Sequence, residues 1–188
     1  MKRETQERGV FRDLRANALL DSPTARITPG LFARTFFTVR YQAVFLFRIS
    51  QAAARRTALG GALIKQFNHV VTGADIAFPA EIGPGLILFH PTGVVIGPSV
   101  RIGSDCVMQQ GVTLGSNGLH RVSEAPSPTI GDHVVLGAGA RVIGPVRIED
   151  RCIVGANAVV TKSSPEAGMT ARGVPARWAV SSARVDAP

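Results

Sequence analysis

The sequence predicts a mainly β protein, in which short strands wind into a parallel β-helix behind an N-terminal α-helical cap. Three observations lead to this fold class. Aliphatic side chains recur every six residues between residues 76 and 160, a smaller apolar residue follows most of them by four positions, and helical patterns are confined to about the first 70 residues. A six-residue period suits neither an α-helix nor a hairpin ladder. It suits a short strand and a turn, three to a coil.

The helical cap is expected over residues 1–70. Helical patterns cover residues 5–21 and about 35–68, the turn signals SPTARITPG lie between them, and LGG at 59–61 marks a break. Residues 1–70 also hold the whole charge excess, with 12 Lys/Arg against 4 Asp/Glu, whereas residues 71–188 hold 9 of each. We interpret this excess as a solvated helical surface, and the alternative is weak contact with a membrane surface.

The β-helix is expected over residues 71–165. The rhythm is kept by Ile76, Ile82, Leu88, Ile96, Ile102, Met108, Leu114, Ile130, Leu136, Val142, Ile148, Val154 and Val160. The slot four residues on holds Ala80, Leu86, Val100, Cys106, Val112, Val134, Ala140, Val146, Cys152 and Ala158. Both slots are predicted to fill a triangular prism. The residue after each aliphatic position is often Gly, which is predicted to permit an unusual turn backbone.

The rhythm slips twice, and both slips predict loops that leave the prism. The first slip adds two residues between Leu88 and Ile96, and it surrounds His90. The second is the sixteen-residue gap between Leu114 and Ile130, which predicts an extruded loop over 115–129. Loops on a rigid scaffold commonly carry function. Residues 166–188 are expected to form a C-terminal extension that covers the last coil.

Composition excludes several classes of function. The chain has two cysteines, no CxxC motif and no Cys/His cluster at metal spacing, which argues against a structural metal and for a reducing compartment. The polar start does not fit a secretory signal, and Arg40 interrupts the longest N-terminal apolar run, so a cytoplasmic protein is expected. Aromatic interleaving and Gly-rich RNA motifs are missing, so nucleic acid is not an expected partner.

The motifs HPTGVVIG, QQGVTLG, PTIGDHVVLGAGARVIG and GVPAR follow one another at a specific spacing. With them the chain resembles the hexapeptide-repeat acyltransferases, and within these most closely serine O-acetyltransferase, over about residues 40–178. The resemblance implies a left-handed β-helix, although parallel crossovers are generally right-handed. It also implies a homotrimer that binds acetyl-CoA as co-substrate between neighbouring prisms, without a metal. The short N-terminal region predicts single trimers rather than paired ones.

The resemblance matches the family's catalytic histidine to His90 and its orienting carboxylate to Asp75, fifteen residues earlier. An alcohol attacks a thioester poorly unless a base removes its proton, and an imidazole pKa near about 6.5 suits that base. A carboxylate on the other ring nitrogen would fix the tautomer. One coil is about eighteen residues long, so the two side chains are expected to meet across adjacent coils. The resemblance also implies a CoA groove lined by Gly115, Ala138 and Ala156, with Arg177 near the phosphates.

The remaining histidines and the cysteines favour structural roles. His69, His120 and His133 are interpreted as surface or satisfied core residues. Cys106 and Cys152 occupy the inward slot, which argues against an acyl-cysteine intermediate.

Departures from the family pattern concern the acceptor. Phe89 stands where the family has an aspartate that engages the serine ammonium, and Pro126 and Ser127 stand where it has Arg-His. Losing such counter-charges forfeits bonds worth roughly 1.5–3 kcal/mol each. The sequence therefore predicts a sugar or other non-serine hydroxyl as acceptor, with Phe89, Ser127 and Arg121 as substrate-binding candidates. Two alternatives stay open: genuine serine O-acetyltransferase of cysteine biosynthesis, with Arg121 or His120 restoring the charge, and a non-catalytic β-helix scaffold.

Overall fold

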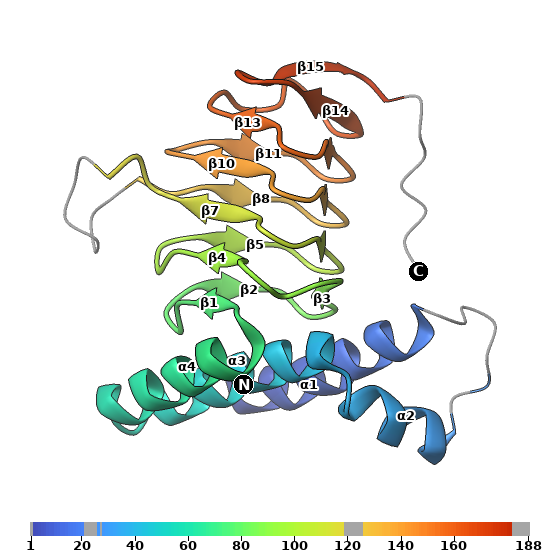
Figure 1. The fold of residues 1–188 in the computed structure, drawn as a ribbon, viewed down its shortest axis with the longest axis vertical. Coiled ribbons are helices and arrows are strands. Elements are labelled where there is room, and N and C mark those ends of the chain that lie inside the picture. The colour runs from blue at the N-terminus through green and yellow to red at the C-terminus, as the bar shows by residue number, and fades with distance from the viewer. Residues whose placement is uncertain (1, 21–25, 27, 119–125, 182–188) are drawn as a thin grey trace.

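The computed structural model describes residues 2–20, 26, 28–118 and 126–181, and for residues 2–8 the backbone alone. Four helices form a layer across one end of a column of coils (Figure 1). They are α1 (Lys2–Leu19), α2 (Pro29–Phe36), α3 (Val39–Ala54) and α4 (Ala58–Thr72). None of the helices in the described part of the chain is long and apolar enough to cross a membrane.

Helix α2 begins within the turn signals, ahead of the helical pattern expected from about residue 35. Thr28 accepts a hydrogen bond from Leu31 N (3.2 Å), and Pro29 occupies the first turn. Both are ordinary features of a helix start. The turn signals around residues 28–30 therefore mark the N-terminus of a further helix.

The LGG sequence at 59–61 also has a different role from the predicted break, because it lies inside α4. A Cβ on Gly61 would approach the Cβ of Ala54 to 2.6 Å. The glycine is required where α4 packs closely against α3. Helix α4 instead ends at Gly73, whose φ of 75° closes the helix in the left-handed conformation.

The strands form three parallel faces of a prism. Face 1 consists of β1 (Asp75–Ile76), β4 (Val95–Ile96), β7 (Thr113–Gly115), β10 (Arg141–Ile143) and β13 (Val159–Val160). Face 2 consists of β2 (Glu81–Ile82), β5 (Arg101–Ile102), β8 (Thr129–Ile130) and β11 (Arg147–Ile148). Face 3 consists of β3 (Ile87–Leu88), β6 (Val107–Met108), β9 (Val135–Leu136), β12 (Ile153–Val154), β14 (Met169–Arg172) and the antiparallel β15 (Arg177–Val180).

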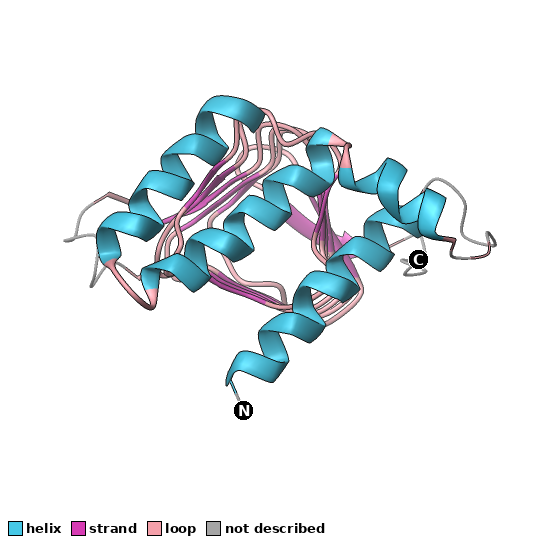
Figure 2. Cartoon of the chain, turned by 90° about the horizontal axis from the view of Figure 1, so that it is seen from below, coloured by secondary structure: helices cyan, strands magenta, loops and turns pink. Residues whose placement is uncertain are grey.

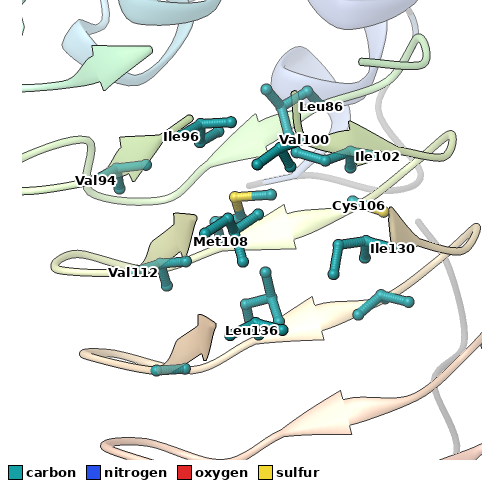
Figure 3. Packing of buried hydrophobic residues seen from close by; sticks show 14 of the residues in the cluster. Leu86, Val94, Ile96, Val100, Ile102, Cys106, Met108, Val112, Ile130 and Leu136 are labelled. Carbon is teal, nitrogen blue, oxygen red and sulfur yellow. The ribbon is translucent and has the colours of Figure 1, made fainter. Parts of the chain in front are cut away.

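The core of the prism confirms the predicted inward slots. All thirteen rhythmic aliphatic residues and all ten residues named above for the slot four positions later are buried, and Ile82 is the most exposed of them at 9%. Figure 3 shows these side chains stacked in layers between the coils, with Cys106 among them. Each coil thus contributes the same small set of apolar groups to one continuous core.

Four of the glycines that follow the rhythmic residues serve close packing rather than an unusual backbone. A Cβ on Gly83 would lie 2.6 Å from the carbonyl group of Gly103 in the next coil, and Gly103, Gly131 and Gly137 meet a neighbouring backbone in the same way. These four glycines are not among the residues of positive φ. The structure therefore corrects the predicted reason for glycine at these positions.

A buried ion pair fixes the cap to the first coil. The Arg48 guanidinium of α3 donates to Asp13 of α1 (2.9 Å) and to the carbonyls of Ile82 (2.7 Å) and Gly83 (2.6 Å). Asp13 also accepts from Gly85 N (2.7 Å). Figure 2 shows the helices lying side by side across the end of the β-helix, which this network connects to β2 and the following turn.

Candidate active site

The turn that carries His90 contains two more residues than the equivalent turn of the next coil. It spans residues 89–94 between β3 and β4, against 109–112 between β6 and β7. Phe89 N donates to the next coil (2.8 Å), and the ladder resumes at Thr92, whose carbonyl accepts from that coil (3.0 Å). His90 and Pro91 are thus the two additional residues. Pro91 is buried and His90 is exposed, so the bulge turns the imidazole out of the prism.

This bulge lies at the edge where face 3 meets face 1, which we call the 3–1 edge. The backbone ladder gives Thr92 the equivalent residues Gln110, Ala138 and Ala156 in the three following coils. Coils stack about 4.8 Å apart, so Ala138 and Ala156 lie roughly 10 and 14 Å along the edge from Thr92. The structure thus brings His90 and two predicted CoA-groove residues to one edge.

Asp75 begins β1 beside the same edge. Its backbone N–H donates to Val94 O (2.8 Å), at the end of the turn that carries His90. Its carboxylate pairs with the ammonium of Lys65 from α4, with Nζ 2.5 Å from Oδ1. Within the described chain no hydrogen bond or ion pair joins Asp75 to His90. The two predicted partners share an edge, and their direct contact stays a prediction.

Two other side chains complete this part of the edge. The ring of Phe89 meets that of His90 edge to face, with centroids 5.5 Å apart, and 38% of Phe89 is exposed. Gln109, which is the equivalent of Phe89 in the next coil, accepts a hydrogen bond from Ala138 N (2.9 Å). The Ala138 carbonyl accepts from Asn157 N in the next coil (2.7 Å), so both backbone groups of Ala138 are engaged and its methyl group is what it presents to the edge.

The second slip leaves the prism elsewhere. Strand β7 of face 1 ends at Gly115 and β8 of face 2 begins at Thr129, so the loop leaves from the edge between faces 1 and 2. A Cβ on Gly115 would meet nothing within 4 Å, so the space above this residue is open. Ser127 lies at the returning end of the loop, and Arg121 and His120 lie outside the described residues. Within one chain Gly115 and Ser127 are on a different edge from His90.

Arg177, predicted to lie near the CoA phosphates, is exposed at the start of β15. The preceding residue, Ala176, donates its N–H to Val159 O (2.8 Å) in β13, the strand that follows Ala156. Arg177 therefore lies beside the coil that holds the last of the predicted groove residues.

The cysteines and the remaining described histidines do not form a second reactive group. Cys106 and Cys152 are fully buried, and burial raises the pKa of the Cys106 thiol to about 12. A thiol with so little thiolate is a poor nucleophile. His69 is exposed on α4, and His133 lies in a turn between faces 2 and 3. The residues described here contain no group of three His, Cys, Asp or Glu side chains that could hold a metal ion.

Sequence reasoning missed Lys65, Gln109 and Gln110. The two glutamines lie in the QQGVTLG motif, one coil of about eighteen residues after the turn that carries His90. That spacing would have placed them next to this turn. Lys65 had no such signal, because its contact with Asp75 depends on how α4 meets β1.

Family models match two segments of the repeat region. Residues 127–162 match the model described as bacterial transferase hexapeptide (six repeats), and residues 93–118 match hexapeptide repeat of succinyl-transferase. Both matches fall on the coils described above.

Curated relatives extend this match. Over 125 residues the chain is 42% identical to a protein named serine acetyltransferase from Mycobacterium tuberculosis, covering 66% of this chain and 52% of the relative. Over 136 residues it is 39% identical to a serine acetyltransferase from Helicobacter pylori, covering 72% of this chain and 78% of the relative. The chain thus spans about half the length of the first relative and over three quarters of the second.

Solved structures agree in fold. A soybean serine acetyltransferase complexed with serine superimposes with a TM-score of 0.82 at 29% identity, covering 94% of this chain and 70% of the other. A serine acetyltransferase in complex with CoA gives a TM-score of 0.78 at 28% identity, with the same coverages. The predicted left-handed β-helix is thereby confirmed. Fold, repeats and relatives together show that this chain belongs to the serine acetyltransferase family of hexapeptide-repeat proteins.

Proposed function

We propose that this chain is an acetyl-CoA-dependent O-acetyltransferase that transfers an acetyl group to the hydroxyl of L-serine. Support comes from the relatives named serine acetyltransferase and from similar structures complexed with CoA and with serine. The observation on this chain that carries the proposal is the bulge that turns His90 out at the 3–1 edge, beside the column of Ala138 and Ala156.

His90 acts as the general base in this proposal. A ring nitrogen takes the proton of the acceptor hydroxyl while the hydroxyl oxygen attacks the thioester carbonyl of acetyl-CoA. The tetrahedral intermediate then expels CoA as a thiolate, which takes the proton back from the imidazolium. The products are the acetyl ester and CoA thiol, and the histidine returns to its neutral form.

Asp75 positions His90. Lys65 occupies Oδ1 of the carboxylate, so Oδ2 is the oxygen that would accept from the second ring nitrogen. Such an acceptor selects the tautomer and stabilises the imidazolium formed during attack. Lys65 in turn fixes the carboxylate from the cap, so α4 has a part in the geometry of the edge.

The arrangement of the edges supports a site shared between copies of the chain. His90, Ala138 and Ala156 lie at the 3–1 edge, whereas Gly115 and Ser127 lie at the edge between faces 1 and 2. A neighbouring prism would bring the second set of residues opposite the first. A homotrimer is the smallest closed ring in which each copy supplies both edges once.

The choice of L-serine corrects the acceptor predicted from the sequence. The non-serine hydroxyl predicted from Phe89, Pro126 and Ser127 gains no support from the comparisons, because the relatives reported above carry the serine acetyltransferase name. The alternative of a genuine serine acetyltransferase is better supported. Phe89 contributes no charge, so the zwitterion must find its counter-charges among other residues.

The proposal is tested by following CoA thiol release from acetyl-CoA with L-serine and with a panel of sugar and neutral alcohol acceptors. Turnover with L-serine is expected to exceed that with every other acceptor. His90→Ala should lower it by about 10²–10⁴-fold, the usual contribution of a positioned base. Asp75→Asn should be less damaging, because the amide oxygen can still accept from the ring.

His69→Ala is the matched control, since it removes an exposed imidazole from α4. It should keep wild-type turnover. Near-normal rates in His90→Ala would refute the assigned base. A sugar acceptor that outperforms L-serine would refute the proposed acceptor while leaving the acetyl transfer intact.

A further inference from the structure

Helix α4 carries an exposed apolar stripe. Its members recur every three or four residues and therefore share one face of the helix. They are Leu59, Leu63, Phe67, Val70 and Val71, which are 70, 62, 57, 74 and 47% exposed. Single exposed apolar residues are ordinary, whereas a contiguous stripe indicates an interaction surface.

The buried contacts of α4 lie on its other sides. Asn68 donates to Ala43 O of α3 (2.9 Å), and Lys65 pairs with Asp75 of β1. Figure 2 shows the helices as one layer in front of the β-helix, with no described segment of the chain on their outer side. Phe37 and Ile49, which are 75% and 36% exposed, add apolar surface from the end of α2 and from α3.

The surroundings of the stripe are positively charged. Residues 22–74 contain seven Arg and Lys and no Asp or Glu. Within this segment Arg48 and Lys65 pair with carboxylates from other parts of the chain. Arg55 and Arg56 are exposed, and they directly precede α4 at the Leu59 end of the stripe.

We propose that the apolar stripe of α4, with Arg55 and Arg56 beside it, docks the protein on the surface of an anionic lipid bilayer. A helix with one apolar face and flanking cations inserts that face at the boundary between headgroups and acyl chains, and the cations bind anionic headgroups. The charge favours this occupant over a second copy of the chain. A second copy paired through the same face would bring an equally cationic segment, without Asp or Glu between residues 22 and 74, and would therefore supply no counter-charge.

The test is flotation of the purified full chain with vesicles of phosphatidylglycerol and phosphatidylcholine in equal parts, compared with vesicles of phosphatidylcholine alone. Strong partition is expected on the anionic vesicles, and weak partition on the neutral ones. High salt should weaken it. Arg55→Gln and Arg56→Gln should each weaken partition about fivefold. The double variant Leu63→Ser and Phe67→Ser should weaken it by about tenfold or more, since it removes inserted apolar area.

Matched controls lie at the other end of the molecule. Val180→Ser removes an equally exposed apolar residue from β15, and Arg151→Gln removes an exposed cation from the β-helix. Both should partition like the unmodified protein. Failure to float with anionic vesicles would overturn the proposal, as would equal partition on neutral ones. A Leu63→Ser and Phe67→Ser protein whose solution mass falls, without a change in partition, would assign the stripe to a second copy instead.

Discussion

Replacing Arg48 by Met should strongly destabilise the protein, because the guanidinium holds the cap on the first coil. It donates to Asp13 (2.9 Å) and to the carbonyls of Ile82 (2.7 Å) and Gly83 (2.6 Å), and the Asp13 side chain is 1% exposed. Met has a similar apolar length but leaves a buried carboxylate without its counter-charge. Breaking a buried pair in this way costs about 3–5 kcal/mol.

Urea denaturation followed by circular dichroism measures the loss. Arg55→Met is the matched control, because Arg55 is exposed at the C-cap of the same helix, α3, and it should change the free energy of unfolding by less than about 0.5 kcal/mol. Adding Asp13→Asn to Arg48→Met should recover at least about 1 kcal/mol, since the amide keeps an acceptor for Gly85 N without a stranded charge. A loss below about 1 kcal/mol in Arg48→Met, or no recovery in the double variant, would refute the reasoning.

Three further predictions concern the core and the acceptor. Burial raises the pKa of Cys106 from 9.0 to about 12, so its contribution to the free energy of unfolding should be constant below about pH 9 and be lost as the pH rises toward 12. Below pH 9, alkylation of Cys106 should be far slower in the native protein than in urea. Constant stability up to pH 12 would contradict this. Gly83→Ala places a Cβ 2.6 Å from the backbone of Gly103 and should lower the free energy of unfolding by about 1–3 kcal/mol. Gly115→Ala, the control, should leave the free energy of unfolding unchanged, because nothing lies within 4 Å of its added Cβ. Equal denaturation midpoints for the two variants would show that the coils can separate. Phe89→Asp should lower the KM for L-serine about tenfold or more, because it adds a carboxylate beside His90 that can pair with the ammonium group of serine. An unchanged KM would show that the ammonium group of serine binds elsewhere.

The His90 site shows how far a repeating sequence can be interpreted. In a β-helix each coil sets its own register, so the six-residue period located the inward slots and showed that the turn between β3 and β4 holds two additional residues. The count placed His90 within the first slip, and the family resemblance then identified it as the candidate base. The count did not show that Pro91 turns inward, because burial depends on the stacked coils.

Contacts between distant segments were beyond such counting. The pairing of Asp75 with Lys65 follows from the angle at which α4 enters β1, and no period in the sequence encodes that angle. The role of Gly83 was also misjudged, because sequence suggests backbone freedom where the structure shows a neighbouring carbonyl. Helix α2 was missed because Thr28 and Pro29 signal a turn and a helix start equally well.

The sequence by itself determined the prism and its two slips, since each depends on the spacing of residues within one or two coils, and the family resemblance indicated the candidate base. Tertiary structure alone decided which side chains share an edge. It gathered His90, Gln110, Ala138 and Ala156 at the 3–1 edge and put the extruded loop at another. The physical reason is that coil stacking turns residues eighteen or more positions apart into neighbours about 4.8 Å apart.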